Sequence, residues 1–207
     1  IEVTGGKNMM EDSVLGKMLN RLNVMEPQQV YAVLQENGLG VSDVTPFAQM
    51  SEAAGGMLTG DSILFVDGFD RALKIPDKGY PGMSLQKTES EKAIRGSNEG
   101  FGDSIKQNTA LIRKRLRSVD LKVAECKCGR RTGTNVDIMY LDGIVRPEIV
   151  TQMQQRLAAF EIDGIGDSGV IEQLTETQWF SPFPQYQTTR RPDRAVMALL
   201  EGRAVLL

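Results

Sequence analysis

Residues 121–141 read LKVAECKCGRRTGTNVDIMYL, and this stretch decides how the second half of the chain folds. Its two flanks, 121–128 and 135–141, are rich in apolar and β-branched side chains, and Gly129 and Gly133 bound the turn between them. The stretch therefore predicts two strands joined as a hairpin. Segments with helical spacing lie on both sides of it. This alternation predicts an α/β fold whose sheet is covered by helices on at least one face.

The segments around this hairpin predict several helices and one more strand. A long helix from about Phe101 to Arg117 precedes the hairpin, and Pro147 follows it in the position of a first helical residue. Apolar side chains then recur with helical spacing at Ile149, Val150, Met153 and Leu157. We also expect a short helix near Ser168–Leu174, a helix from Pro192 that ends before Gly202, and a strand that begins at Arg203.

The first part of the chain mixes strands and helices as well. We expect a strand at Ile1–Val3 and helices near Met9–Leu22, Pro27–Glu36 and Phe47–Leu58. The last of these helices is weakened by Gly55 and Gly56, because glycine costs helix stability. A hairpin follows, with strands at 62–66 and 72–75 and the turn Asp67-Gly68 between them.

Charge and Pro/Gly content predict two lobes. Residues 1–60 carry seven acidic side chains against three basic ones, whereas residues 106–131 carry nine basic side chains against two acidic ones. Pro76–Gly82 and the polar stretch to Ser90 interrupt both kinds of periodicity. We therefore expect an N-terminal α/β lobe at 1–80, a linker at 81–93 and a C-terminal α/β lobe at 94–207, each lobe a small mixed β-sheet packed with helices.

Composition excludes several classes of function. The 207 residues contain no histidine, so a Ser-His-Asp or Cys-His nucleophile pair and a histidine-bearing zinc site are excluded. No phosphate-cradling loop occurs, and we expect no cofactor, no metal site and no enzymatic activity. The two cysteines, Cys126 and Cys128, are expected to be free thiols in a reducing compartment. Because the net charge is −3, we expect no nucleic-acid partner. Binding of nucleic acid through the basic helix remains a distant alternative.

The helix expected at 101–117 carries the most information about a site. At 100° per residue, Asn108 and Arg115 fall inside its apolar arc, which predicts a buried polar cluster with Glu99, Asp193 or loop carbonyls as acceptors. The alternative is that Arg115 lays its methylenes on the core and extends its charge to solvent. Four cations, Lys106, Arg113, Lys114 and Arg117, fall on the flank or the opposite side. They form either an outward contact face or a merely solvated one.

Motifs in this part of the chain resemble those of one protein family. The stretches Ile94–Phe101 and Asn108–Arg115 resemble a signature of the A subunits of spore germinant receptors, the GerA family. Further matches are Ile162-Asp163, Asp167-Ser168-Gly169, Phe180–Pro184, Arg191-Pro192-Asp193 and Leu199–Arg203. The sequence departs from the family pattern at Ser97-Asn98, where Pro-Arg is common, and at Arg190, where glutamate is usual.

The resemblance implies a non-enzymatic domain that couples and assembles a receptor. By this resemblance we expect the cytoplasmic N-terminal domain of an A subunit, in the inner membrane of the bacterial spore, with membrane-spanning segments after residue 207. The implied partners are a transporter-like B subunit, a lipoprotein C subunit and further copies of the A subunit. The resemblance leaves open a paralogue of the receptors that is encoded with the dipicolinate channel.

Two functions stay open for such a domain: a coupling and assembly module in nutrient-triggered germination, or a direct sensor that binds a small nutrient in a cleft between the lobes. We expect one set of residues to form the polar framework of the family motif: Arg95, Glu99, Asn108, Arg115, Arg191 and Asp193.

Overall fold

The computed structural model describes residues 44–76, 99–178 and 180–207, together with residues 26, 29, 32 and 91. The strand expected at Ile1–Val3 and the helix at Met9–Leu22 lie outside the described residues, as does almost all of the helix at Pro27–Glu36. The chain divides into two compact units, Ile1–Ser84 (unit 1) and Leu85–Leu207 (unit 2), and we describe each by itself.

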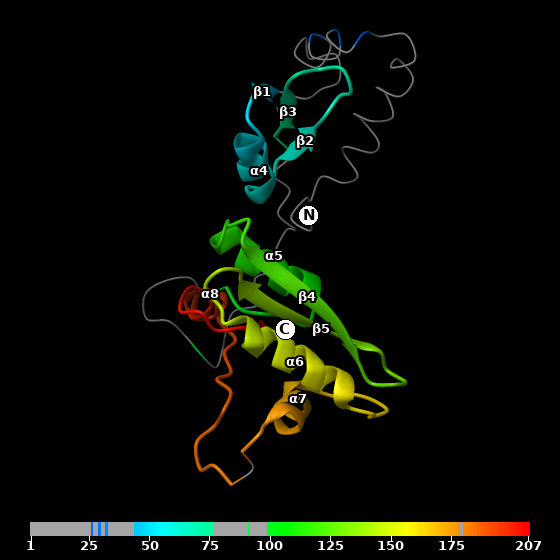
Figure 1. Ribbon diagram of the computed structural model, residues 1–207, viewed down its shortest axis with the longest axis vertical. Helices are drawn as coiled ribbons and strands as arrows, with labels where there is room; N and C mark the ends of the chain where they lie inside the picture. The colour runs from blue at the N-terminus through cyan, green and yellow to red at the C-terminus, as the bar shows by residue number, and fades with distance from the viewer. Residues whose placement is uncertain are drawn as a thin grey trace. The chain divides into compact units, whose positions relative to one another are not determined.

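The described part of unit 1 is a small sheet with one helix packed on it (Figure 1). Its elements are β1 (Thr45–Phe47), α4 (Met50–Leu58), β2 (Ser62–Leu64) and β3 (Ala72–Ile75). The strands are antiparallel in the order β1-β3-β2, and α4 contacts all of them. Ala53 of α4 and Leu73 and Ile75 of β3 are completely buried and form the core of this unit.

The helix expected at Phe47–Leu58 begins at Met50, because Phe47 is the last residue of β1 and pairs with Ala72 of β3. That pairing joins residues far apart in the sequence, and helical spacing gives no information about it. The hairpin expected after α4 is present, with Gly68 in its turn at a φ of 79°.

Alanine substitutions at two adjacent glycines of α4 are expected to affect stability differently. A Cβ at Gly55 would meet nothing within 4 Å, whereas a Cβ at Gly56 would lie 3.1 Å from Ile63 Cδ1 and 3.4 Å from Phe47 Cε2. Gly55→Ala is therefore expected to stabilise unit 1 by about 0.5–1 kcal/mol, because alanine is the better helix former. Gly56→Ala is expected to lose that gain to crowding. Urea unfolding followed by circular dichroism measures both, and an equal gain from the two substitutions would contradict the packing described here.

The sheet of unit 2 contains the hairpin that the sequence predicts. Strands β4 (Leu121–Cys128) and β5 (Thr134–Leu141) are antiparallel, and Leu121 pairs with Leu141 and Cys128 with Thr134 at the two ends of the ladder. A short strand, β6 (Val205–Leu206), adds to the other edge of β5 and gives the order β4-β5-β6. Backbone hydrogen bonds in both directions between Asp137 and Leu207 extend this pairing to the last residue.

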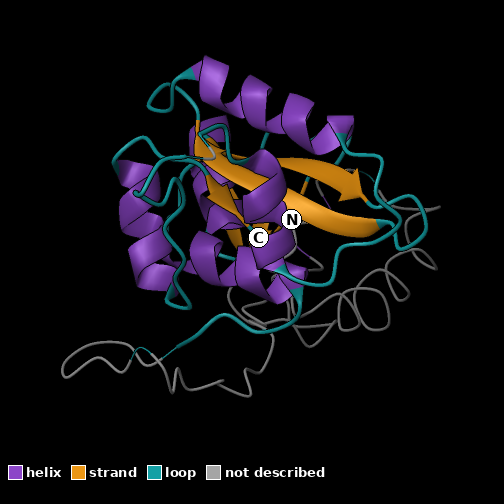
Figure 2. Ribbon diagram, turned by 90° about the horizontal axis from the view of Figure 1, so that it is seen from below, coloured by secondary structure: helices purple, strands orange, loops and turns teal. Residues whose placement is uncertain are grey.

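Helices cover both faces of this sheet (Figure 2). They are α5 (Ile105–Arg115), α6 (Pro147–Ala159), α7 (Ser168–Thr175) and α8 (Pro192–Leu200). Side chains alternate along β5, so that Met139 faces α5 and α8 while Ile138 faces α6. One core contains Ile112, Leu121, Met139, Leu141, Ala195, Val196 and Leu199, and the other contains Cys128, Val136, Ile138, Met153 and Leu157.

The α/β fold class is confirmed: the described residues contain five helices and two three-stranded sheets. The expectation of mixed sheets is wrong, since every strand pair in the described residues is antiparallel. The short connections between β2 and β3 and between β4 and β5 account for two of these pairs, because a parallel pair needs a longer crossover. The helix expected at Phe101–Arg117 is shorter at both ends, and its last helical residue is followed by Leu116 in an extended conformation.

Candidate functional site

The residues before α5 are bound to the helix by the side chain of Asn108. Asn108 Oδ1 accepts a hydrogen bond from Gly102 N at 2.9 Å, and Asn108 Nδ2 donates to Gly102 O at 2.8 Å. Asn108 is only 9% exposed. An amide buried on an apolar helix face needs such partners, and the backbone of Gly102 supplies both a donor and an acceptor.

Glu99 binds two cations from the last turn of α5. Its Oε1 lies 2.8 Å from Lys114 Nζ, and its Oε2 lies 2.7 Å from Arg115 Nη2. The Glu99 side chain is 16% exposed and that of Arg115 is 24% exposed. Burial raises the pKa of Glu99, but the hydrogen bonds and charges of Lys114 and Arg115 outweigh burial, so its pKa lies below the ordinary value. The carboxylate is thus held ionised between two cations.

A second ion pair lies at the start of α8. Arg191 Nε donates to Asp193 Oδ1 at 3.1 Å, and Arg191 Nη2 donates to Asp193 Oδ2 at 2.5 Å, which is the bidentate geometry that arginine favours. The hydrogen bond from Arg191 lowers the pKa of Asp193 against the opposing effect of burial, and the charges of Arg191 and Arg115 lower it further. Asp193 also lies in the first helical turn, where the helix dipole favours an anion.

Backbone contacts join the two ion pairs. Phe101 N donates to Arg190 O at 2.8 Å, which connects the segment before α5 to the segment before α8. Glu91 Oε2 accepts hydrogen bonds from Thr189 Oγ1 at 2.9 Å and from Arg190 N at 3.1 Å, and Glu91 Oε1 lies 3.4 Å from Arg194 Nη1. We call Glu91, Glu99, Asn108, Lys114, Arg115, Arg191 and Asp193, with the backbone of residues 100–102 and 189–191, the polar framework.

The structure brings together most of the residues that the sequence singles out. Glu99 contacts Arg115, and Arg191 contacts Asp193, whereas Asn108 contacts the backbone of Gly102 and neither ion pair. Arg95 lies outside the described residues.

The outward cations are not all outward. Lys114 belongs to the polar framework, since Glu99 binds it. Of the other cations expected on the outward face, Lys106 and Arg117 are exposed and Arg113 is half-buried. The remaining outward face is therefore smaller than the sequence suggests, because a lysine on the flank of a helix is long enough to reach a carboxylate beside it.

Two features were missed from the sequence. Glu91 was expected in the linker, and no sequence signal separates it from other glutamates of a polar stretch. Thr109 and Asp137 form a buried pair beneath α5, with Thr109 Oγ1 3.4 Å from Asp137 Oδ2. A threonine on the apolar arc of the helix and an aspartate within a strand could have indicated this pair.

The hydrogen bonds at Arg190 do not depend on its side chain, although glutamate is usual in the family at this position. The hydrogen bonds of Arg190 with Phe101 and Glu91 are made by its backbone, while its side chain is exposed. A glutamate at this position could make the same two bonds.

The lowered pKa values predict how stability depends on pH. A carboxylate with a lowered pKa stabilises the fold fully above its ordinary value, which is 4.5 for Glu99 and 3.8 for Asp193, and loses this contribution as the pH falls through the lower folded value. Urea midpoints at neutral pH and below pH 4 should therefore differ less in Glu99→Gln than in the unaltered chain. Equal pH dependence in the two proteins would contradict the ion pairing of Glu99.

Comparisons with known proteins identify the family of the chain. The model of the Bacillus/Clostridium GerA spore germination protein family matches residues 2–207. The chain belongs to the GerA family. This is a family of germinant receptors and not of enzymes. Within the described residues, no helix is long and apolar enough to cross a membrane.

Three curated relatives match 81–97% of the chain, whereas the chain spans only 33–41% of their length. Membrane protein YfkQ of Bacillus subtilis (strain 168) is 39% identical over 168 residues, which are 81% of this chain and 33% of the relative. Spore germination protein KA of the same organism is 29% identical over 200 residues, 97% of this chain and 37% of the relative. Spore germination protein GerLA of Bacillus cereus is 30% identical over 200 residues, 95% of this chain and 41% of the relative.

A solved structure has the same fold. The crystal structure of the N-terminal domain of the A subunit of the Bacillus megaterium spore germinant receptor GerK3 matches with a TM-score of 0.70 and 28% identity. The match covers 98% of this chain and 73% of that one. This GerA chain therefore corresponds to the N-terminal domain of a germinant receptor A subunit involved in spore germination.

Proposed function

We propose that this GerA domain is a coupling and assembly module that transmits displacement between the subunits of a germinant receptor. The observation that carries the proposal is the polar framework, whose side chains, apart from Glu91, lie on three of the segments that resemble the family signature. It joins α5 and α8 through charge and backbone contacts on one side of the sheet. Helices joined in this way move as one body, which is what a coupling element needs.

The partners proposed are those of a receptor complex: a transporter-like B subunit, a lipoprotein C subunit and further copies of the A subunit. We place the complex in the inner membrane of the spore, with this domain on the cytoplasmic side. Relatives that are membrane proteins support the membrane location. The free thiols Cys126 and Cys128 are consistent with a reducing compartment.

Calorimetry separates this proposal from direct sensing of a nutrient. The 207-residue chain is titrated with amino acids, sugars and nucleosides. A coupling module is expected to give no saturable heat with any of them. Saturable binding by the chain alone would replace the proposal with a sensor that binds the nutrient itself.

Charge reversal tests the assembly role on residues that the fold does not need. Lys106 and Arg117 are exposed, so Lys106→Glu with Arg117→Glu is expected to leave the urea midpoint within the range of surface changes. In the full-length A subunit the pair is expected to lower recovery of the other subunits and slow nutrient-triggered germination several-fold.

The matched control is Lys122→Glu with Lys127→Glu, which makes the same change in charge on two exposed residues of β4. If both pairs reduce germination equally, the effect follows net charge and the outward face has no special role. If neither pair alters subunit recovery or germination, this face is not a contact.

A further inference from the structure

The loop between α7 and α8 exposes aromatic side chains in a segment without charge. No charged residue occurs between Glu176 and Arg190. Phe180 is fully exposed and Phe183 is 77% exposed, the highest values among the large apolar side chains of the described residues. Isolated exposed apolar residues are ordinary, but two phenylalanines in one uncharged loop are a candidate docking surface. In Figure 1 the loop, drawn in orange, extends away from α6 and α7.

Hydrogen bonds within the loop hold these side chains outward. Ser181 Oγ accepts from Phe183 N at 3.2 Å, and Ser181 N donates to Gln178 O at 3.0 Å. At the base, Gln185 Oε1 accepts from the backbone and the hydroxyl of Thr177, at 3.0 and 2.9 Å. Pro182 and Pro184 restrict the backbone on either side of Phe183. The polar groups thus bond within the loop while the aromatic rings face outward, so little order has to be gained on docking.

We propose that Phe180 and Phe183 insert into the interface of a lipid bilayer. Aromatic side chains on an uncharged, proline-containing loop suit the boundary between headgroups and acyl chains, where burial of charge is costly and rings are favoured. Relatives of the chain are membrane proteins, which gives the loop a bilayer to meet. Phe180 and Phe183 make none of the contacts of the polar framework that are described above and are distinct from the cations Lys106 and Arg117, so their role goes beyond the proposed coupling function.

The chain contains a natural reporter for this insertion. Its single tryptophan, Trp179, precedes Phe180 in the sequence, so tryptophan fluorescence reports on this loop alone. We mix the 207-residue chain with vesicles of phosphatidylcholine, and with vesicles of equal parts phosphatidylcholine and phosphatidylglycerol. Vesicles with brominated acyl chains serve as the quenching arm. The expected result is co-flotation with both kinds of vesicle, a blue shift of the emission, and quenching by the brominated lipid that persists at high salt.

Substitutions separate insertion from adsorption by charge. Phe180→Ser with Phe183→Ser is expected to lower vesicle partitioning by roughly tenfold or more, because binding scales with the apolar area buried. Val119→Ser with Met197→Ser removes other exposed apolar side chains, at 58% and 57%, and is expected to leave partitioning unchanged.

Three results would overturn the proposal. The first is an absence of flotation and quenching. The second is vesicle binding that high salt abolishes and that the phenylalanine substitutions do not alter. The third is concentration-dependent self-association that these substitutions remove, without any vesicle binding. The last result would assign the loop to a protein partner. None of them bears on the calorimetric and germination tests of the coupling function.

Discussion

Glu99→Gln is expected to destabilise unit 2 by about 2 kcal/mol, because one substitution removes the anion that two cations share. Glutamine keeps the volume and one acceptor oxygen but has no charge, so Lys114 and Arg115 remain close together as like charges. The expected loss of stability is smaller than that for breaking a fully buried pair, since Lys114 is 32% exposed and water screens its charge. Urea unfolding should show a lower midpoint with an unchanged slope.

A double-mutant cycle tells a specific ion pair from general destabilisation. Glu99→Gln combined with Arg115→Met is expected to show a larger coupling energy than Glu99→Gln combined with Lys114→Met, because Arg115 is the more buried partner. Glu148→Gln provides the control, since Glu148 is an exposed carboxylate in the first turn of α6. Additive effects in both cycles would mean that Glu99 acts through packing and not through its charge.

The same residue tests the coupling function in the receptor. With Glu99→Gln in the full-length A subunit, germination should slow in spores that still contain the receptor, because the segment before α5 is no longer held by charge to the last turn of that helix. Germination that is unchanged at an equal receptor level would separate the polar framework from function while leaving its role in stability intact.

Local periodicity accounts for what the sequence could predict. The apolar and β-branched content of residues 121–128 predicts β4 with the bounds that the structure has, and the turn Gly129–Gly133 predicts its partner, since a hairpin is a short-range structure. The helical period likewise placed Asn108 and Arg115 on the buried side of α5. Because a buried polar group without a partner is costly, the sequence also predicts that these two inward side chains have polar partners.

Contacts between distant segments were beyond such reasoning. Helical spacing could not show that Phe47 pairs with Ala72, nor that Glu91 meets the residues before α8. Lys114 was placed on the outward flank from its angle alone, although a long side chain can reach past its own position on the helix. Phe183 lies between the helix expected near Ser168–Leu174 and the one expected from Pro192, but the hydrogen bonds around it, and with them the exposure of the rings, depend on side-chain geometry that spacing does not encode.

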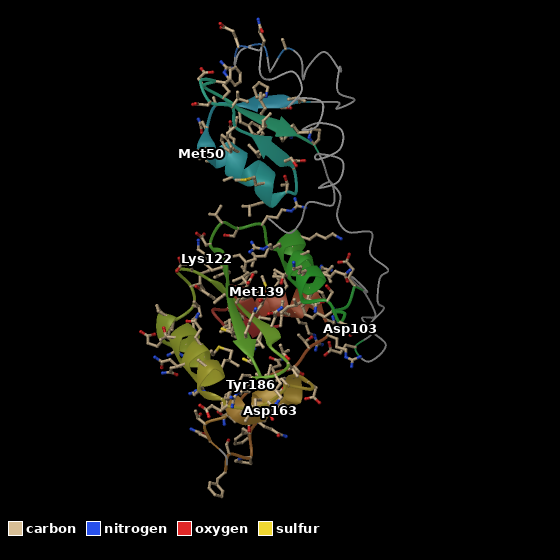
Figure 3. The ribbon with its side chains drawn as sticks, turned by 90° about the vertical axis from the view of Figure 1, so that its right-hand side faces the viewer. Met50, Asp103, Lys122, Met139, Asp163 and Tyr186 are labelled. Atoms are coloured by element: carbon tan, nitrogen blue, oxygen red, sulfur yellow. The ribbon has the colours of Figure 1, made fainter. Side chains whose placement is uncertain are left out.

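Ile112→Ala is expected to have the largest effect on unit 2, at about 3–4 kcal/mol. Ile112 is completely buried in the core between α5, α8 and the sheet, and its truncation leaves a cavity that the packed neighbours fill only in part. Leu73→Ala is the matched substitution in unit 1, because Leu73 is completely buried in the center of the small sheet. Figure 3 shows the dense side chains around Met139, a member of the same core as Ile112.

Hydrogen exchange of the Ile112→Ala and Leu73→Ala variants, measured by mass spectrometry, tests the two-lobe organisation that we propose. If residues 1–80 and 94–207 are separate folding units, Ile112→Ala should speed exchange in β4 and β5 by two orders of magnitude or more and leave β3 unchanged, because about 1.4 kcal/mol corresponds to tenfold. Leu73→Ala should do the reverse. Loss of protection in both units from either substitution would mean that the chain unfolds as one body and that the two lobes are not separate folding units.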